Sequence, residues 1–298
     1  MSSLPLIIGY GGINSGGISS TDQSYRNMVA PNLSIKSKDH LYKSLAALIE
    51  EKAGETATKT AKSINTDPSV LADKFFIRKI IRKDLFNPEA TPYYQTNRRV
   101  DKFPISFAAC LPDGFVPGVG YDSNNHPRAL QMGVFGANDA LNAAGIDIES
   151  INQNIAPDRL AVYCGSGLGQ LDNLGMGGVL TAMIKQERTI TKQLPFSYPQ
   201  MTADFINAYI INNLGQTGNC CGACATFLYN LALAVTTIKI GKVDLAIVGT
   251  SEAPILPQLM CAFYNMGAMT SDSKIPSGDF SKASLPFGNN FGFVMGES

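Results

Sequence analysis

The pattern of apolar and polar positions predicts helices and strands that alternate through the second half of the chain. Residues 128–144 follow a helical pattern that stops at Gly145. Residues 160–164 form a short apolar run, which predicts a strand. Residues 201–213 carry apolar side chains on one face and stop before Gly215, which predicts a further helix. Alternation of this kind is typical of the α/β fold class.

The segment 218–249 predicts one more helix and one more strand. Residues 225–238 contain no charged side chain and carry apolar residues on several faces, so we expect a helix that is buried nearly all round. Gly241 ends this helix. The run 245–248 is continuously apolar and is bounded by Gly249, a pattern typical of a central strand in a parallel sheet.

Glycines shape the start of the chain. Leu6 to Gly9 is a short apolar run that predicts a first buried strand, and a glycine-rich loop follows it. This loop does not complete a dinucleotide-binding fingerprint, because Asn14 stands where the third glycine belongs and the expected acidic residue is missing. We expect instead a loop whose backbone passes close to another element.

A basic stretch lies in the first third of the chain. Residues 74–83 interleave apolar side chains with five positive charges. We interpret them as a helix with a solvated basic face. A docking patch for an acidic partner is the alternative.

The composition narrows the class of protein. With 298 residues and 45% hydrophobic content, the chain can bury a substantial core in one large or two modest domains. Its 24 basic and 24 acidic residues cancel, so net charge gives no argument for nucleic acid or an anionic membrane as a partner. The sequence shows no secretory signal and no apolar stretch of membrane-spanning length, so we expect a cytoplasmic protein with reduced thiols.

Cys224 is the residue with the clearest chemical potential. It lies at the first turn of the helix predicted over 225–238, where unpaired backbone N–H groups and the helix dipole favour the nucleophilic thiolate. A small buried hydrophobic residue is the simpler interpretation. A third possibility is a redox pair, because Cys221 and Cys224 form a C-x-x-C motif. A zinc site is disfavoured, since the candidate ligands outside this stretch are scattered singly.

A glycine-rich loop, Gly-Ser-Gly-Leu-Gly at 165–169, follows the strand predicted over 160–164. It is not a nucleophile elbow, because Cys164 occupies the first glycine position of G-x-S-x-G. It is neither a P-loop nor a complete dinucleotide fingerprint. Its glycines allow the backbone to approach a ligand or a helix closely.

Seven stretches of the chain together carry a family resemblance. They are LPLIIGYGG near the start, PRALQM at 127–132, VYCGSGLGQLD at 162–172, KQLPFSYPQMTADFINAYI at 192–210, TGNCCGACATFLYNLALA at 217–234, VGTSEAPILP at 248–257 and ASLPFGNNFGFVMGES at the end. Together they resemble the N-terminal half of the β-ketoacyl-acyl carrier protein synthases, and the match to the long FabY-type branch is close.

The resemblance implies a fold. It is the α/β thiolase-like fold, here the N-terminal α/β/α half with a mixed five-stranded sheet. Residues 1–298 would form a β-ketoacyl synthase N-terminal domain that is interrupted by a helical insertion at about 35–105.

The resemblance also implies an activity and a site. Cys224 corresponds to the nucleophile that takes an acyl group as a thioester, and its backbone N–H to one of two oxyanion-hole donors. Leu168 matches the residue that closes the acyl pocket, and Phe263 matches an aromatic lining the same pocket. Phe196 falls where members send a side chain across the dimer interface. The implied reaction is decarboxylative condensation of a short acyl primer with malonyl-acyl carrier protein in a homodimer, without metal or organic cofactor.

Two departures from the family pattern stand out. Leu285 replaces an arginine, with Gly288 and Asn290 in place of other family residues, so the ion-pair network of ordinary members is not expected. The two catalytic histidines and the lysine of the family belong to its C-terminal half, and neither His40 nor His126 matches their positions. We therefore expect the chain to be the first half of a larger condensing enzyme.

Two other interpretations stay open. One is a non-catalytic, chain-length-factor-like partner subunit that shapes an acyl pocket for a second synthase. The other is a thiol-disulfide protein that uses Cys221 and Cys224.

Overall fold

The computed structural model describes residues 5–21, 34–36, 78–79, 104–213, 215–275, 283–284 and 291–298. Most of the helical insertion expected at about 35–105 lies outside these residues. His40, Leu285, Gly288 and Asn290 also lie outside them.

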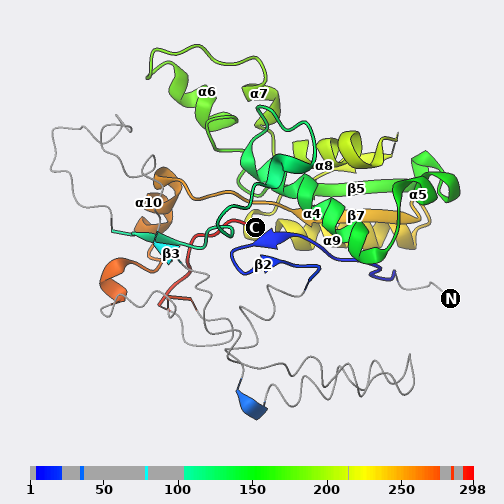
Figure 1. Ribbon diagram of the computed structural model, residues 1–298, viewed down its shortest axis with the longest axis horizontal. Coiled ribbons are helices and arrows are strands. Elements are labelled where there is room, and N and C mark those ends of the chain that lie inside the picture. The colour runs from blue at the N-terminus through cyan, green and yellow to red at the C-terminus, as the bar shows by residue number, and fades with distance from the viewer. Residues whose placement is uncertain are drawn as a thin grey trace.

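A parallel sheet of three strands forms the core of the larger, helix-covered part of the described fold, on the right in Figure 1. Its order is β6 (Gln216–Gly218), β5 (Leu160–Gly165) and β7 (Leu245–Thr250). Strand β5 is the middle strand, and all six of its residues are buried. The parallel pairing predicted for the strand over 245–248 is confirmed, but its central place is wrong within these three strands, because β7 lies at an edge. The five-stranded mixed sheet stays a prediction.

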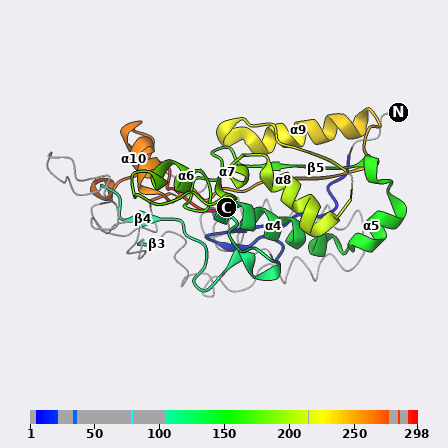
Figure 2. The same ribbon diagram turned by 90° about the horizontal axis from the view of Figure 1, so that it is seen from above.

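Helices cover both faces of this sheet (Figure 2). Helix α9 (Thr226–Lys239) lies on one face, and α4 (Arg128–Ala144) with α8 (Met201–Ile206) lies on the other. Helix α4 ends at Gly145, whose φ of 66° is left-handed, so the predicted helix over 128–144 is confirmed together with its glycine cap. The sheet and its helices form the α/β/α layers expected of a thiolase-like half.

A second hydrophobic core lies at the other end of the molecule (Figure 1). It gathers side chains from β4 (Phe107–Ala108), from α10 (Pro257–Asn265) and from the segment 291–298. Strand β3 (Arg78–Lys79) pairs antiparallel with β4. The helix expected over 74–83 is therefore wrong at these two residues, because their backbone is extended.

The remaining elements are short. They are β1 (Ile13–Asn14), β2 (Gly17–Ile18), α5 (Ile148–Asn154), α6 (Met176–Ala182), α7 (Gln193–Phe196), the π-helical turn Asn207–Ile211 that continues α8, and the 3₁₀ turns Pro117–Gly120, Pro157–Arg159, Ala223–Ala225 and Asp272–Lys274. Among the described helices, none combines the length and the apolar character that crossing a bilayer requires.

The start of the chain differs from the expectation in one respect and agrees in another. Leu6 and Ile7 are each 84% exposed and belong to no strand, so the predicted first buried strand is wrong in the described fold. The glycines that follow do pass close to another element. A Cβ added at Gly11 would lie 2.2 Å from the backbone nitrogen of Ala140 in α4, so only a glycine fits this contact.

Helix α9 is not buried nearly all round. Phe227, Leu228 and Tyr229 are exposed, with Leu228 at 62%. The buried stripe of the helix is small and largely polar, and consists of Thr226, Asn230, Ala234 and Thr237. The prediction from hydrophobic content that this helix is buried on nearly all sides is therefore wrong.

Candidate active site

Cys224 lies in the 3₁₀ turn Ala223–Ala225, directly before α9, and it is exposed. Thr226 closes this turn, because its Oγ1 accepts a hydrogen bond of 3.0 Å from Gly222 N–H and donates one of 2.7 Å to the Ala223 carbonyl. The predicted place of Cys224 at the start of the helix is confirmed. The interpretation of Cys224 as a small buried hydrophobic residue is wrong, since the side chain faces the surface.

The backbone of the turn takes an uncommon conformation. Ala223 has a φ of 51°, in the left-handed region that non-glycine residues rarely adopt. Gly222 before it has no room for a side chain, because a Cβ there would lie 1.9 Å from the ring of Tyr229. These two residues fix the path of the chain into Cys224.

Asn230 anchors the segment that leads into the turn. It is fully buried in α9, and its Oδ1 accepts a hydrogen bond of 2.7 Å from Cys220 N–H. Its Nδ2 donates to Asn219 Oδ1 at 2.9 Å and to the Gly249 carbonyl at 3.2 Å. One side chain thus ties the approach to Cys224 to the end of β7.

The glycine-rich loop after β5 lies directly against the turn. A Cβ added at Gly167 would lie 2.4 Å from the Ala223 carbonyl oxygen, so the two backbones are in contact. Leu168 is the next residue and is half-buried. Segments that are more than fifty residues apart in sequence, 165–169 and 222–226, therefore form one site at the carboxyl ends of β5 and β6.

A carboxylate that the sequence patterns did not single out holds this loop. Ser166 Oγ donates to Glu252 Oε2 at 2.7 Å, and Gly167 N–H donates to Glu252 Oε1. Burial raises the pKa of Glu252, and the hydrogen bonds from Ser166 and Gly167 oppose that rise. Thr226, Asn230 and Glu252 are polar residues inside or next to apolar runs, which is the signal that could have identified them.

The two predicted aromatic residues lie in other clusters. Phe196 packs edge-to-face against His126, with ring centroids 5.2 Å apart, and against Phe205 at 5.1 Å. Phe263 packs edge-to-face against Phe293 at 5.2 Å, in the second core. The structure thus brings the loop of Leu168 to Cys224, while Phe196 and Phe263 contact different neighbours.

The cysteines of the described residues are free thiols. Cys221 and Cys224 form no disulfide, and Cys221 Sγ lies 3.7 Å from the Gly167 carbonyl oxygen. Cys164 differs from both, since burial raises its pKa to about 12, which disfavours the thiolate that acts as a nucleophile. Within the described ranges, no group of three or more His, Cys, Asp and Glu side chains is arranged to hold a metal ion.

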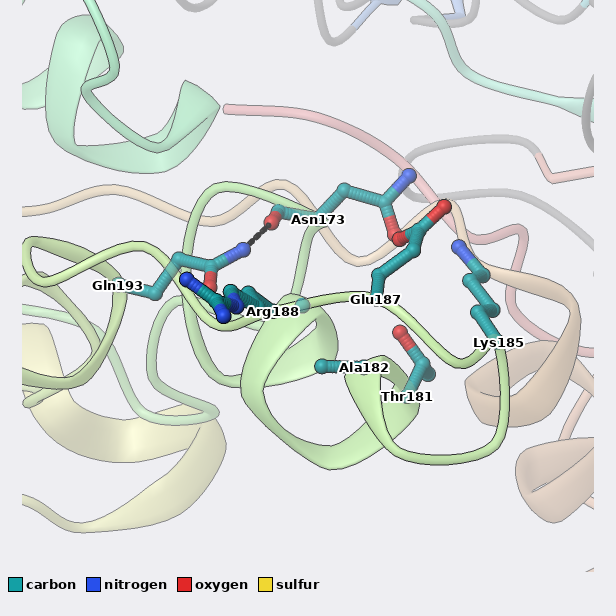
Figure 3. A pocket seen from close by; sticks show the side chains of 8 residues that line it. Asn173, Thr181, Ala182, Lys185, Glu187, Arg188 and Gln193 are labelled. Atoms are coloured by element: carbon teal, nitrogen blue, oxygen red, sulfur yellow. Dashed lines mark hydrogen bonds between the residues drawn. The ribbon is translucent and has the colours of Figure 1, made fainter.

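A polar hollow of about 250 Å³ lies near α6 and α7 (Figure 3). Its lining includes Lys185, Glu187 and Arg188, and Gln193 Nε2 donates to the Asn173 carbonyl at its edge at 2.8 Å. All residues of this lining fall between 173 and 193. The hollow is therefore separate from the turn that carries Cys224.

The chain is similar to known condensing enzymes over its whole length. The curated FabY of Pseudomonas aeruginosa, a β-ketoacyl-[acyl-carrier-protein] synthase, is 32% identical over the whole of this chain and 57% of its own length. The crystal structure of that noncanonical ketosynthase superposes with a TM-score of 0.72, covering 100% of this chain and 56% of the other. The chain thus spans little more than half the length of these relatives.

A second solved structure supports the fold. A β-ketoacyl synthase from Burkholderia phymatum matches with a TM-score of 0.63 at 18% identity, over 100% of this chain and 57% of its own. The family model described as "Beta-ketoacyl synthase, N-terminal domain" matches residues 122–298. This range contains both the glycine-rich loop and the Cys224 turn. The chain therefore belongs to the β-ketoacyl synthase family and has the thiolase-like fold of its N-terminal half.

Proposed function

We propose that this chain supplies the acyl-accepting half of a β-ketoacyl-acyl carrier protein synthase in fatty acid biosynthesis, with Cys224 as the nucleophile. The observation that carries the proposal is the exposed Cys224, held in a strained turn at the start of α9. Family membership supports the same role. Cys164 is buried, with 3% of its surface exposed, which makes it a poorer candidate than Cys224.

The first step is transfer of an acyl group to the sulfur. The Cys224 thiolate attacks the carbonyl carbon of an acyl thioester, the new carbon–sulfur bond forms, and the carrier thiol leaves with a proton. We propose the backbone N–H of Cys224 as one donor to the oxyanion of the tetrahedral intermediate. The second donor lies outside the positions that the resemblance assigns.

The second step forms the carbon–carbon bond. Loss of carbon dioxide from a malonyl thioester leaves an enolate carbanion, which attacks the acyl carbon and displaces the Cys224 sulfur. The residues that polarise the malonyl carbonyl in this family are two histidines and a lysine of its C-terminal half. His126 does not take this role, since it is buried between aromatic rings in the described fold.

The acyl pocket is proposed from three residues. Leu168 is best supported, because its loop contacts the Cys224 turn through Gly167. Phe263 is proposed as a pocket aromatic, and Phe196 as a residue that reaches toward a second subunit. The last two roles rest on the resemblance alone.

The proposed partners follow from the reaction. Acyl carrier protein would deliver malonyl and acyl thioesters, and no metal or organic cofactor is proposed. We also propose a homodimer in the cytoplasm. Phe227, Leu228 and Tyr229 at the start of α9 are exposed, and large apolar side chains that lie exposed close together favour an interface.

The two other interpretations are less well supported. A chain-length-factor-like subunit needs no reactive cysteine, whereas Cys224 is exposed in a shaped turn. A thiol-disulfide protein would use Cys221 as well, and the two thiols are unbonded. The family match favours the synthase over the second of these.

Acyl labelling tests the proposal. The 298-residue chain, alone and together with the C-terminal half of a family member, is incubated with radiolabelled acetyl-CoA and then separately with cerulenin. We expect covalent labelling of the wild type and of Cys221→Ala and Cys220→Ala, and its loss in Cys224→Ala. Labelling that survives Cys224→Ala contradicts the proposal, and dependence on both Cys221 and Cys224 favours redox chemistry.

A further inference from the structure

A partly buried hydrogen-bond centre holds the glycine-rich loop that carries Leu168, between backbone hydrogen bonds from Ser166 N–H to Pro199 and from Gln170 N–H to Ser197 at the two ends of the loop. Ser166 Oγ accepts from Gly169 N–H at 2.8 Å and from Leu168 N–H at 3.2 Å. Glu252 completes the centre, because its two oxygens accept from Ser166 Oγ and from Gly167 N–H. Three consecutive backbone N–H groups of the loop are thus satisfied by two side chains.

The chemistry of this centre requires a carboxylate. Ser166 Oγ already accepts hydrogen bonds from two N–H groups, so both of its lone pairs are used. Toward Glu252 the hydroxyl can therefore act only as a donor. Gly167 can only donate. A glutamine at 252 would present one oxygen and one NH₂ group, and the NH₂ group would face either another donor or a saturated oxygen. An isosteric change of one atom therefore breaks one of the two contacts.

The centre reaches the nucleophile through Gly167. This glycine donates to Glu252 and touches the Ala223 carbonyl on its other side, one residue before Cys224. Glu252 itself follows β7, and its backbone exchanges hydrogen bonds with Ser298 at 2.6 and 3.1 Å. Two neighbouring strands, β5 and β7, thus fix the distance between Leu168 and the Cys224 turn.

We propose that Glu252 is a positioning residue that, through Ser166, sets the distance of Leu168 from Cys224 and so limits the length of the acyl group that Cys224 accepts. The inference rests on the proposed function, because it assigns a specificity role within that site. Glu252 does not touch the substrate in this proposal. Its effect passes through the backbone of 166–169.

The test compares acyl chain lengths. Single-turnover acylation of Cys224 is measured with acetyl-, hexanoyl- and decanoyl-CoA for the wild type and Glu252→Gln. We expect the ratio of decanoyl to acetyl rates to rise about tenfold in Glu252→Gln, since a released loop no longer fixes Leu168. A uniform fall at all three lengths, which a purely structural role would give, overturns the proposal.

The chain offers a matched control at Asp139. This carboxylate also binds a glycine N–H and a serine hydroxyl, Gly12 at 2.9 Å and Ser20 at 2.5 Å, but it belongs to α4, on the opposite face of the sheet from α9. Asp139→Asn breaks the same kind of contact, and we expect it to leave the chain-length ratio unchanged. A ratio that shifts equally in both variants would overturn the proposal.

Two further variants keep the outcomes distinct. Ser166→Ala removes the same centre from the other side and is expected to shift the ratio in the same direction, so it provides the test if Glu252→Gln does not fold. Cys224→Ala separates the two proposals. If labelling persists in Cys224→Ala, the proposed function fails. If labelling needs Cys224 but the ratio in both loop variants equals that of the wild type, only this inference fails.

Discussion

The side-chain oxygen of Asn230 accepts a hydrogen bond of 2.7 Å from the backbone N–H of Cys220, four residues before the candidate nucleophile. The same side chain donates to the Gly249 carbonyl at the end of β7. A buried amide that satisfies backbone groups on two elements holds both in register. Asn230 therefore links the position of Cys224 to the sheet.

Replacement of Asn230 by alanine is expected to loosen this link. The change removes a fully buried side chain and leaves Cys220 N–H and Gly249 C=O without their side-chain partner, so we expect the free energy of unfolding to fall by about 1–3 kcal/mol. Urea titration measures this loss. A stability of Asn230→Ala equal to that of the wild type would contradict the argument.

Gly167→Ala is expected to disturb the site directly. Its new Cβ would lie 2.4 Å from the Ala223 carbonyl, so one of the two segments must move. We expect acylation of Cys224 to slow by about tenfold or more, with a stability loss of about 1–3 kcal/mol. Gly120→Ala is the matched control, because nothing lies within 4 Å of its added Cβ. Equal acylation rates in the two variants would show that the contact is unimportant.

The ion pair of Arg128 and Glu297 is expected to matter for stability. Arg128 Nε and Nη2 donate to the buried Glu297 carboxylate at 2.6 and 3.0 Å. Arg128→Leu leaves that carboxylate without its cation, so we expect a loss of about 3 kcal/mol in urea titration.

Two comparisons check this interpretation. The double variant Arg128→Leu/Glu297→Leu should lose less than Arg128→Leu alone, because no unpaired charge remains. Arg159→Leu, which breaks the exposed pair with Asp244, should change stability much less than Arg128→Leu. A larger effect at Arg159 would contradict the role of burial.

His126 is expected to make stability depend on pH. Burial lowers its pKa below the usual value of 6.5; Asp122 opposes this shift, and Lys192 adds to it. The unfolded chain therefore takes up a proton at a higher pH than the folded chain. The contribution of neutral His126 to the free energy of unfolding is fully present above about pH 6.5 and is lost as the pH falls toward the pKa of the folded state. The loss is on the order of 1 kcal/mol per pH unit.

Unfolding titrations at pH 7.5, 6.5 and 5.5 measure this slope. His126→Gln removes the titrating group, and His40 is present in both proteins, so the difference between the two slopes reports on His126. We expect a flatter profile for His126→Gln. Parallel profiles would assign the pH dependence to other groups.

The sequence pattern correctly predicted those helices and strands whose limits depend on neighbouring residues in the chain. The helix over 128–144 has its glycine cap and its apolar stripe in the sequence itself, and the structure reproduces both limits. The strand over 160–164 has a continuous apolar run because both of its faces are covered. The position of Cys224 before α9 followed from the same kind of signal.

The sequence did not show whether an apolar residue is covered by another segment of the chain. Leu6 and Ile7 look like a buried strand, yet they have no strand beside them in the described fold. In α9, the residues that pack on the sheet are small or polar, because close approach and hydrogen bonds to loop ends matter more there than hydrophobicity. Contacts such as that of Glu252 with Gly167 join segments that are distant in sequence, so they cannot be predicted from a local pattern.

Ala223 shows how the turn keeps its shape. Its left-handed φ of 51° costs about 1–2 kcal/mol for an alanine, a strain that glycine would avoid. Alanine also gives the unfolded chain fewer backbone conformations than glycine would, which stabilises the folded state. The strain exceeds the roughly 0.4–1 kcal/mol that alanine gains through the unfolded chain, so glycine at 223 would make the fold more stable but would leave the backbone next to Cys224 freer to move.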